Sequence, residues 1–323
     1  MLLNIAMPAN ASIFMGALLQ IAAFDAVPTD NMYIYMFDID DTPISENFNA
    51  LGYETLQFVY NTGSIGLVIF FFLPFSITVY LLRFLPFEVC EKYSERKSGK
   101  IFFGEFFAFF IESYLILAVC FCINLTNMKW AHDDDHKVRT FGVNLNIVLT
   151  YVFTVLLIGM PIVVAFTSTK YFEELTQDSK KKERYGKFIE ELNTKRNGKM
   201  VILYPVFNQV RKLSLAFTVV FLQRNPYFSL FSVNFQILFM IILVGLTKPF
   251  AKKRDNAVDM FNEFTLLVIN YHLMSLTDWV SDGDTREVIG WSMIAMTLFS
   301  IAVNFTILAV EQYSLLRHKY LQW

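Results

Sequence analysis

Seven blocks of predominantly apolar residues constrain this chain more than any other feature of its sequence. A helix needs about 20 mostly apolar residues to cross a bilayer, because its backbone polar groups must be satisfied inside the helix. With 55% hydrophobic and 17% charged residues, the composition is also unlike that of a soluble domain. The sequence therefore predicts an all-α polytopic membrane helix bundle with seven spans, at residues 60–82, 101–125, 141–166, 200–222, 227–247, 258–280 and 288–313.

The distribution of the 27 Lys and Arg residues predicts the orientation of these spans. Residues 1–82 contain neither type, and most of the 27 lie in alternate connections: 83–100, 167–199, 248–257 and the tail after 313. Because positively charged loops stay in the cytoplasm, we expect the N-terminus outside and the C-terminus in the cytoplasm.

Two domains follow from this topology. Residues 1–59 are expected to form an extracellular acidic segment with a short interfacial helix at 11–24, an apolar stretch too short to span comfortably. Residues 60–323 form the seven-span domain, with a basic cytoplasmic loop at 167–199. The acidic segment is either carried across by the first span, or this chain is the membrane part of a longer one.

Charged and amide side chains inside the apolar blocks are the candidate functional residues, because they are costly in lipid and face protein or water. Glu112 and Arg211 each lie about 16 Å along their block from its cytoplasmic start. We predict that these two form an intramembrane pair, with Lys212 or Glu105 as a second layer. Two residues of the sixth block continue the polar layer as lining: Asn270 and His272.

Two interpretations of this polar layer stay open. It is an ion path with Glu112 as a cation site, or it is a set of neutralised charges and interhelical hydrogen bonds that hold the helices together. The structural interpretation is favoured for the amide residues Asn234, Gln236 and Asn304.

The loops carry charge of both signs. Acidic residues of two outer loops are expected to attract cations: Asp133, Asp134, Asp135, Asp282 and Asp284. His132 and His136 flank the first group, but no third ligand is placed by the sequence, so no metal site is predicted. Basic residues of the cytoplasmic loop either contact anionic lipid headgroups or serve only as a positive-inside signal: Lys180, Lys181, Lys182 and Arg184.

Enzyme and nucleic-acid functions find no support in the sequence. It contains no P-loop, dinucleotide fingerprint, paired-Cys metal motif or nucleophile elbow, so neither an enzyme nor a cofactor is expected. A net charge of −2 gives no reason to expect a nucleic-acid partner. The expected surroundings are a lipid bilayer and inorganic cations.

Several short patches along nearly the whole chain resemble the TRP-like (transient receptor potential-like) C-terminal transmembrane module of ciliate-type protist surface proteins. They are Pro8-Ala9-Asn10, Phe24-Asp25, Phe48 to Leu51 with Gly52-Tyr53-Glu54, Asn61, Tyr204-Pro205 with Arg211-Lys212, Lys248-Pro249-Phe250, Asn262-Glu263 and Gly290-Trp291. The resemblance implies a surface location, in the plasma or ciliary membrane, and a candidate cation channel or ion-sensing protein.

The channel that the resemblance implies is one of two interpretations. Residues 281–287 between the last two blocks form a short acidic turn, whereas the resemblance leads us to expect about twenty residues for a re-entrant helix and filter. A channel would need a continuous wet path, which we expect in a homo-oligomer. The alternative is a non-conducting seven-span receptor or membrane scaffold.

Overall fold

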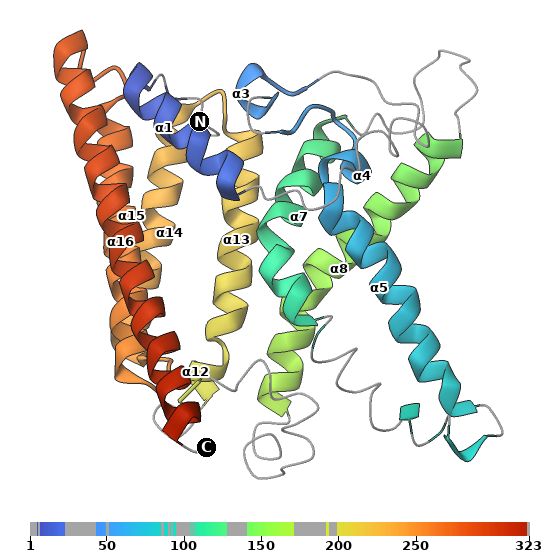
Figure 1. The fold of residues 1–323 in the computed structure, drawn as a ribbon. Helices are drawn as coiled ribbons and strands as arrows, with labels where there is room; N and C mark the ends of the chain where they lie inside the picture. Colours follow the sequence, from blue (N-terminus) through green and yellow to red (C-terminus); the bar gives the residue numbers. More distant parts are fainter. Residues whose placement is uncertain are drawn as a thin grey trace.

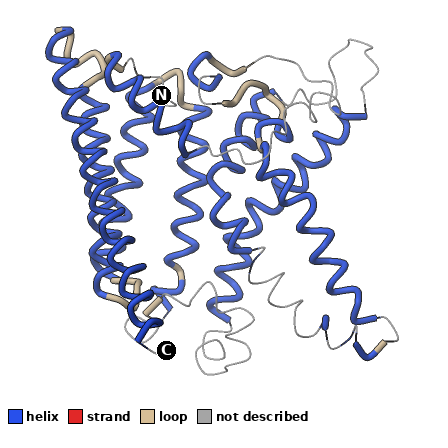
Figure 2. The backbone as a smooth tube through the Cα atoms, in the orientation of Figure 1, coloured by secondary structure: helices blue, strands red, loops and turns tan. Residues whose placement is uncertain are grey.

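The computed structural model describes residues 5, 7–22, 43–49, 52–84, 87–89, 91, 93–94, 105, 107–127, 141–170, 192–193 and 199–321. Helices dominate this part of the chain (Figure 1 and Figure 2). Within it, the only pairing of extended backbone is an isolated antiparallel bridge between Leu192 and Phe250. The predicted all-α class is confirmed for the described residues.

In the part of the chain that the structure describes, seven long helices form the bundle, with short helices at its ends. The long ones are α5 (Gly63–Leu81), α7 (Phe107–Asn127), α8 (Phe141–Lys170), α13 (Tyr204–Phe221), α14 (Pro226–Thr247), α15 (Lys253–Ser275) and α16 (Gly283–Leu321). The shorter ones are α1 (Ala9–Ala22), α3 (Glu46–Asn49), α4 (Phe58–Asn61), the 3₁₀ turn η1 (Leu82–Phe84) and α12 (Lys199–Ile202).

Among the described residues, five stretches are long and apolar enough to cross a membrane, judged by length and composition: Gly63–Phe84, Ala108–Thr126, Asn144–Lys170, Pro226–Thr247 and Gly283–Arg317. Each overlaps one of the predicted blocks. The other two blocks, 200–222 and 258–280, also form helices, α13 and α15, but these are too polar to qualify. The sequence thus predicted the existence of all seven helices, and α15 begins at Lys253, five residues earlier than predicted.

Successive long helices along the chain run in alternating directions (Figure 1). Figure 1 shows α1 and α3 at one end of the bundle, which we call the α1 end, and the C-terminus at the opposite end, the C-terminal end. α7, α13 and α15 run toward the α1 end, and the other four long helices run away from it. The helix pairs that pack most extensively are α7 with α13, and α14 with α15.

α7 lies at the centre of the largest apolar core. Within its candidate span 61% of the residues are buried, against 33% or less in the other four. Phe110, Tyr114 and Leu117 pack there with residues of α4, α8 and α13. Phe48 of α3 belongs to the same core, so residues of the predicted acidic segment pack directly on the helix bundle.

The contact between α7 and α8 depends on a proline. Pro161 lies inside α8 and has no N–H, so it cannot donate to the carbonyl of Leu157 four residues earlier. The hydroxyl of Tyr114 donates to this carbonyl at 2.7 Å, and the Tyr114 side chain is fully buried. A side chain of α7 therefore replaces the hydrogen bond that the proline removes from α8.

Tyr114→Phe should lower the free energy of unfolding by about 1–3 kcal/mol, because the buried Leu157 carbonyl loses its donor. Pro161→Ala supplies an N–H to the same carbonyl, so Tyr114→Phe should cost less in that background. Thermal unfolding of the two single variants and the double variant in detergent measures both costs. An equal cost in both backgrounds would contradict this account.

At the α1 end, α1 packs against the first turns of α16 at a glycine. The Asn10 side-chain amide donates to the carbonyl of Glu287 at 3.1 Å. A Cβ on Gly290 would lie 2.5 Å from Asn10 Oδ1 and 2.7 Å from Pro8 Cγ. The absence of a side chain at this position allows the two helices to approach this closely.

We expect Gly290→Ala to destabilise the protein by about 1–3 kcal/mol, because the added methyl forces α1 away from α16. Gly159→Ala in α8 is the matched control, since its Cβ would meet nothing within 4 Å. That control should be neutral or slightly stabilising, because alanine favours a helix more than glycine does. Thermal unfolding compares the two variants, and a Gly290→Ala variant as stable as the control would show that α1 does not pack tightly there.

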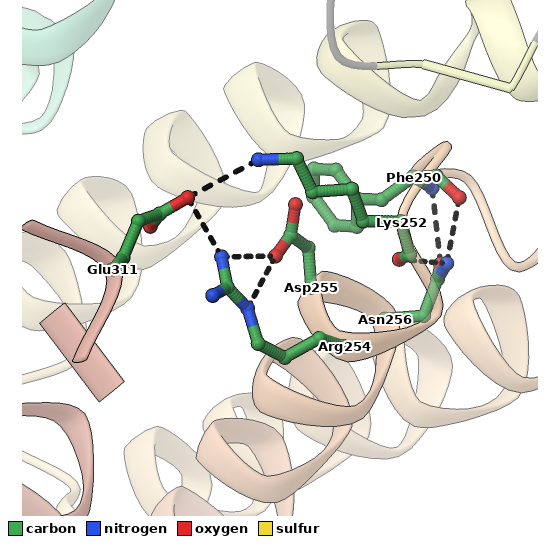
Figure 3. A network of polar contacts seen from close by, with 6 residues as sticks. All are labelled: Phe250, Lys252, Arg254, Asp255, Asn256 and Glu311. Carbon is green, nitrogen blue, oxygen red and sulfur yellow. Dashed lines mark hydrogen bonds and ion pairs between the residues drawn. The ribbon is translucent and has the colours of Figure 1, made fainter. Parts of the chain in front are cut away.

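The turn between α14 and α15 is fixed by side chains at the C-terminal end (Figure 3). The Asn256 carboxamide accepts from the backbone N–H of Phe250 at 3.0 Å and donates to its carbonyl at 2.7 Å. Glu311 of α16 accepts from Lys252 at 3.1 Å and forms an ion pair with Arg254 at 2.8 Å. These contacts tie the start of α15 to α16.

Candidate functional site

α13 and α15, the two long helices that are too polar to qualify as spans, contact each other through charged and polar side chains. The Tyr204 hydroxyl of α13 donates to Asp259 Oδ2 of α15 at 2.8 Å. Arg211 Nη1 donates to Glu263 Oε1 in an ion pair further along the same two helices. We call these four residues, Tyr204, Arg211, Asp259 and Glu263, the charged cluster.

The local sequence explains how the cluster forms. Tyr204 and Arg211 are two helical turns apart, and Asp259 and Glu263 are one turn apart, so each pair lies on one face of its helix. α13 and α15 run in the same direction, toward the α1 end (Figure 1). Tyr204 and Asp259, the residues nearer the C-terminal end, therefore meet each other. Arg211 and Glu263, which lie nearer the α1 end, meet in the same way.

Tyr204 and Glu263 of the cluster are buried, Arg211 and Asp259 are half-buried, and the charges are unequal. The side chains of Arg211 and Glu263 are 18% and 7% exposed. Glu263 Oε2 is buried and has no hydrogen-bond partner, although Oε1 is bound by Arg211. Two carboxyl groups thus face one guanidinium, and burying a charge without a partner is strongly unfavourable.

The prediction that Arg211 pairs with Glu112 is wrong. Arg211 binds Glu263, whereas Glu112 is exposed on α7 and acts electrostatically on Lys212. Lys212 Nζ donates to the carbonyl of Ile111 at 3.0 Å. Neighbouring residues of a helix point about 100° apart, so Arg211 faces α15 and Lys212 faces α7.

The reason for this error lies in the start of α15. The block 258–280 placed Glu263 only one turn inside its span. The helix begins at Lys253, so Glu263 lies ten residues along it, at about 15 Å. Glu263 therefore lies deeper in its helix than the block implied, where it meets Arg211.

The other predicted lining residues point to different neighbours. The Asn270 amide donates weakly toward α14, to the Leu230 carbonyl at 3.4 Å and to Asn234 Oδ1 at 3.5 Å. His272 Nε2 lies 2.9 Å from the Ser292 hydroxyl of α16. Glu105 lies just before α7 and is exposed. The structure therefore does not gather these residues around one point.

Amide and hydroxyl pairs link the helices of the C-terminal half. Asn262 of α15 and Asn304 of α16 hydrogen-bond to each other through their side chains, at 2.8 and 3.3 Å. Between α13 and α14, the hydroxyls of Thr218 and Ser232 are 3.1 Å apart, and Gln236 donates to Ser232 at 3.3 Å within α14. Asn304 and Asn234 thus make the interhelical contacts expected of them.

Asp282 of the predicted outer acidic turn has a structural contact. Its carboxylate accepts from the Thr285 backbone N–H at 2.8 Å and from the Thr285 hydroxyl, as an N-cap residue does at the start of a helix. These two hydrogen bonds lower the pKa of Asp282 below its usual value. Asp284 is exposed in the first turn of α16. The residues Asp133, Asp134, Asp135, Lys180, Lys181, Lys182 and Arg184 lie outside the described part of the chain.

Comparison with protein-family models, with curated proteins and with solved structures found no match. The resemblance to a TRP-like module therefore stays a prediction.

Sequence reasoning missed Tyr204, Asp259 and Glu263 as members of the site. Tyr204 and Glu263 stand within the patches that carry the resemblance, but without a role. Asp259 and Glu263 form an i, i+4 carboxylate pair in an otherwise mostly apolar block. Two acids on one face of such a helix need a positive partner, and that signal could have indicated Arg211.

A double-mutant cycle tests the pair that the structure forms. Arg211→Gln and Glu263→Gln should show a coupling of about 1–3 kcal/mol in thermal unfolding, because each single change leaves a buried charge unpaired. Arg211→Gln with Glu112→Gln is the control cycle, and it should be additive within about 0.5 kcal/mol. Coupling between Arg211 and Glu112, together with additivity between Arg211 and Glu263, would instead support the pair predicted from the sequence.

Proposed function

We propose that this chain is a multi-pass membrane protein with a TRP-like transmembrane domain, and that it conducts or senses cations. In this proposal α5, α7, α8, α13, α14, α15 and α16 are the seven spans, the α1 end is outside and the C-terminus is cytoplasmic. The membrane is the plasma or ciliary membrane. Basic residues of the loop 167–199 contact anionic lipids on the cytoplasmic side.

The pairing of charges between α13 and α15 supports counting these two helices among the seven spans. α13 and α15 are too polar to cross a bilayer as isolated helices. Paired with each other, Arg211 and Glu263 present a neutral pair to their surroundings, and Tyr204 satisfies one oxygen of Asp259. Intramembrane charges that pair in this way face the interior of a bundle rather than lipid.

The single observation that carries the cation function is the surplus carboxylate of the charged cluster. Asp259 and Glu263 face one guanidinium, and Glu263 Oε2 is buried without a partner. Cation paths through membranes are typically lined by such carboxylates, which compensate the loss of water around the ion.

A non-conducting receptor or scaffold is the second candidate, and a specific observation favours it. Side chains such as Asn262 with Asn304, and His272 with Ser292, bond across helix interfaces. Polar residues engaged in this way stabilise helix association, as they do in membrane proteins with no ion path.

Cation flux into liposomes that hold the purified protein separates the two candidates. For a conducting protein, Glu263→Gln should reduce flux at least about tenfold, the effect of about 1.4 kcal/mol on the barrier. Glu112→Gln tests the α7 side in the same way. Glu287→Gln is the control, since this residue is exposed in the first turns of α16, away from the cluster.

The result decides between the candidates once folding of each variant is established. Flux through wild type and the Glu287→Gln control, lost in Glu263→Gln, supports conduction through the cluster. No flux from folded wild type with several cations and both signs of voltage would favour the receptor or scaffold.

A further inference from the structure

Two oxygen atoms without partners lie on one face of α15. Glu263 Oε2 and Asn270 Oδ1 are buried and make no hydrogen bond, and their residues are 5% and 3% exposed. Seven residues separate them, so they share a face and lie about 10 Å apart along the helix. Both atoms can only accept, so the missing partner is a hydrogen-bond donor or a cation.

Asp259 stands on the same face, one turn before Glu263. Its Oδ2 accepts from Tyr204, a neutral donor that leaves the carboxylate charge in place. Arg211 is the positive group that contacts the pair, through Glu263 Oε1. Among the described contacts, the charged cluster carries one negative charge in excess if both carboxyl groups are ionised.

Lys212 of α13 donates to the Ile111 carbonyl of α7, and four charged groups around the start of α15 are engaged with one another. Lys252 and Arg254 at the start of α15 contact Glu311 of α16, and Arg254 also contacts Asp255 (Figure 3). The helix α14 contains no Asp, Glu, Lys, Arg or His, and Tyr227 in its first turn donates to Asp278. α16 faces this part of α15 with Asn304, which pairs with Asn262. These contacts offer no second positive charge to the cluster.

We propose that Asp259 and Glu263 together bind one exchangeable proton, with Arg211 as the fixed counter-charge. The proton comes from water and bonds to a carboxylate oxygen, and no other bond is made or broken. The inference rests on the proposed function, whose sensed ion it names.

A proton fits the observed oxygen set. Glu263 offers one oxygen that is buried and unpartnered, while its other oxygen is held by Arg211. A proton needs one such oxygen, whereas Ca²⁺ takes about 6–8 oxygen ligands. With the proton bound, one carboxylate faces one guanidinium and the cluster is neutral. Its release leaves a net negative charge between α13 and α15, which weakens their packing.

Infrared difference spectra of the full chain in lipid nanodiscs, recorded between pH 5 and pH 9, test the proposal. A protonated carboxylic acid has a carbonyl stretch that is absent from a carboxylate. We expect this band in wild type at the lower pH and its loss as the pH rises. Glu263→Gln should remove it, and Asp259→Asn should shift the pH at which it is lost. Glu112→Gln, an exposed carboxylate beside a lysine, should leave it unchanged.

Thermal stability gives a second measurement that does not require spectroscopy of a single group. The folded cluster holds the proton more tightly than the unfolded chain, so the native state binds more protons and stability falls as pH rises through the titration. One proton corresponds to a Tm decrease of about 2–4 °C per pH unit. Glu263→Gln should flatten this dependence, because glutamine mimics the protonated acid.

Three outcomes would overturn the proposal. They are the absence of a titrating band in folded wild type, a band unchanged in both Glu263→Gln and Asp259→Asn, and a pH response that moves with sodium concentration, which would assign the site to a metal cation. Failure of the proton-site proposal can be distinguished from failure of the proposed cation function. A titrating band without cation flux keeps the proton site and removes conduction, whereas flux without the band does the reverse.

Discussion

The ion pair of Arg211 with Glu263 is the charged contact that joins α13 to α15. In an apolar surrounding, each of these groups alone would be excluded from the interior of a helix bundle. Together, with Tyr204 on Asp259, they make α13 and α15 compatible with burial. α13 packs against α7, α8 and α14, and its side chains in the charged cluster reach α15.

The same requirement, that buried polar groups find partners on a neighbouring helix, recurs through the bundle. Tyr114 of α7 donates to the carbonyl that Pro161 leaves free in α8. Asn304 pairs with Asn262 between α16 and α15. In an apolar environment the helices have little hydrophobic reason to associate, so such contacts specify which helices are neighbours.

Glu263 Oε2 and Asn270 Oδ1 are among the buried atoms that depart from this pattern, and these two share one face of α15. Local conflicts of this kind occur at functional sites, where structure gives up stability for chemistry. The contacts at Asn262 and His272 lie toward α16 and are satisfied. α15 therefore has one side whose polar groups bond to α16 and another side on which these two oxygens have no hydrogen-bond partner.

The sequence by itself determined the helical class and the positions of seven long helices. The reason is that a run of about 20 apolar residues has few alternatives to a helix where no water is available to bind its backbone polar groups. It also determined that Arg211, Lys212 and Glu112 need partners, because charge in an apolar block is costly. The sequence could not say which partner each one takes.

The tertiary structure decided the partners. Arg211 and Lys212 are adjacent in sequence but face different helices, so their partners depend on which helices pack against α13. The start of α15 at Lys253 set the depth of Glu263, and contacts to Phe250 and Glu311 fix that start. The spacing between residues along one helix can be read from the sequence, but the start of the helix cannot. Rotation and neighbours are set by packing of the whole bundle, which no single block contains.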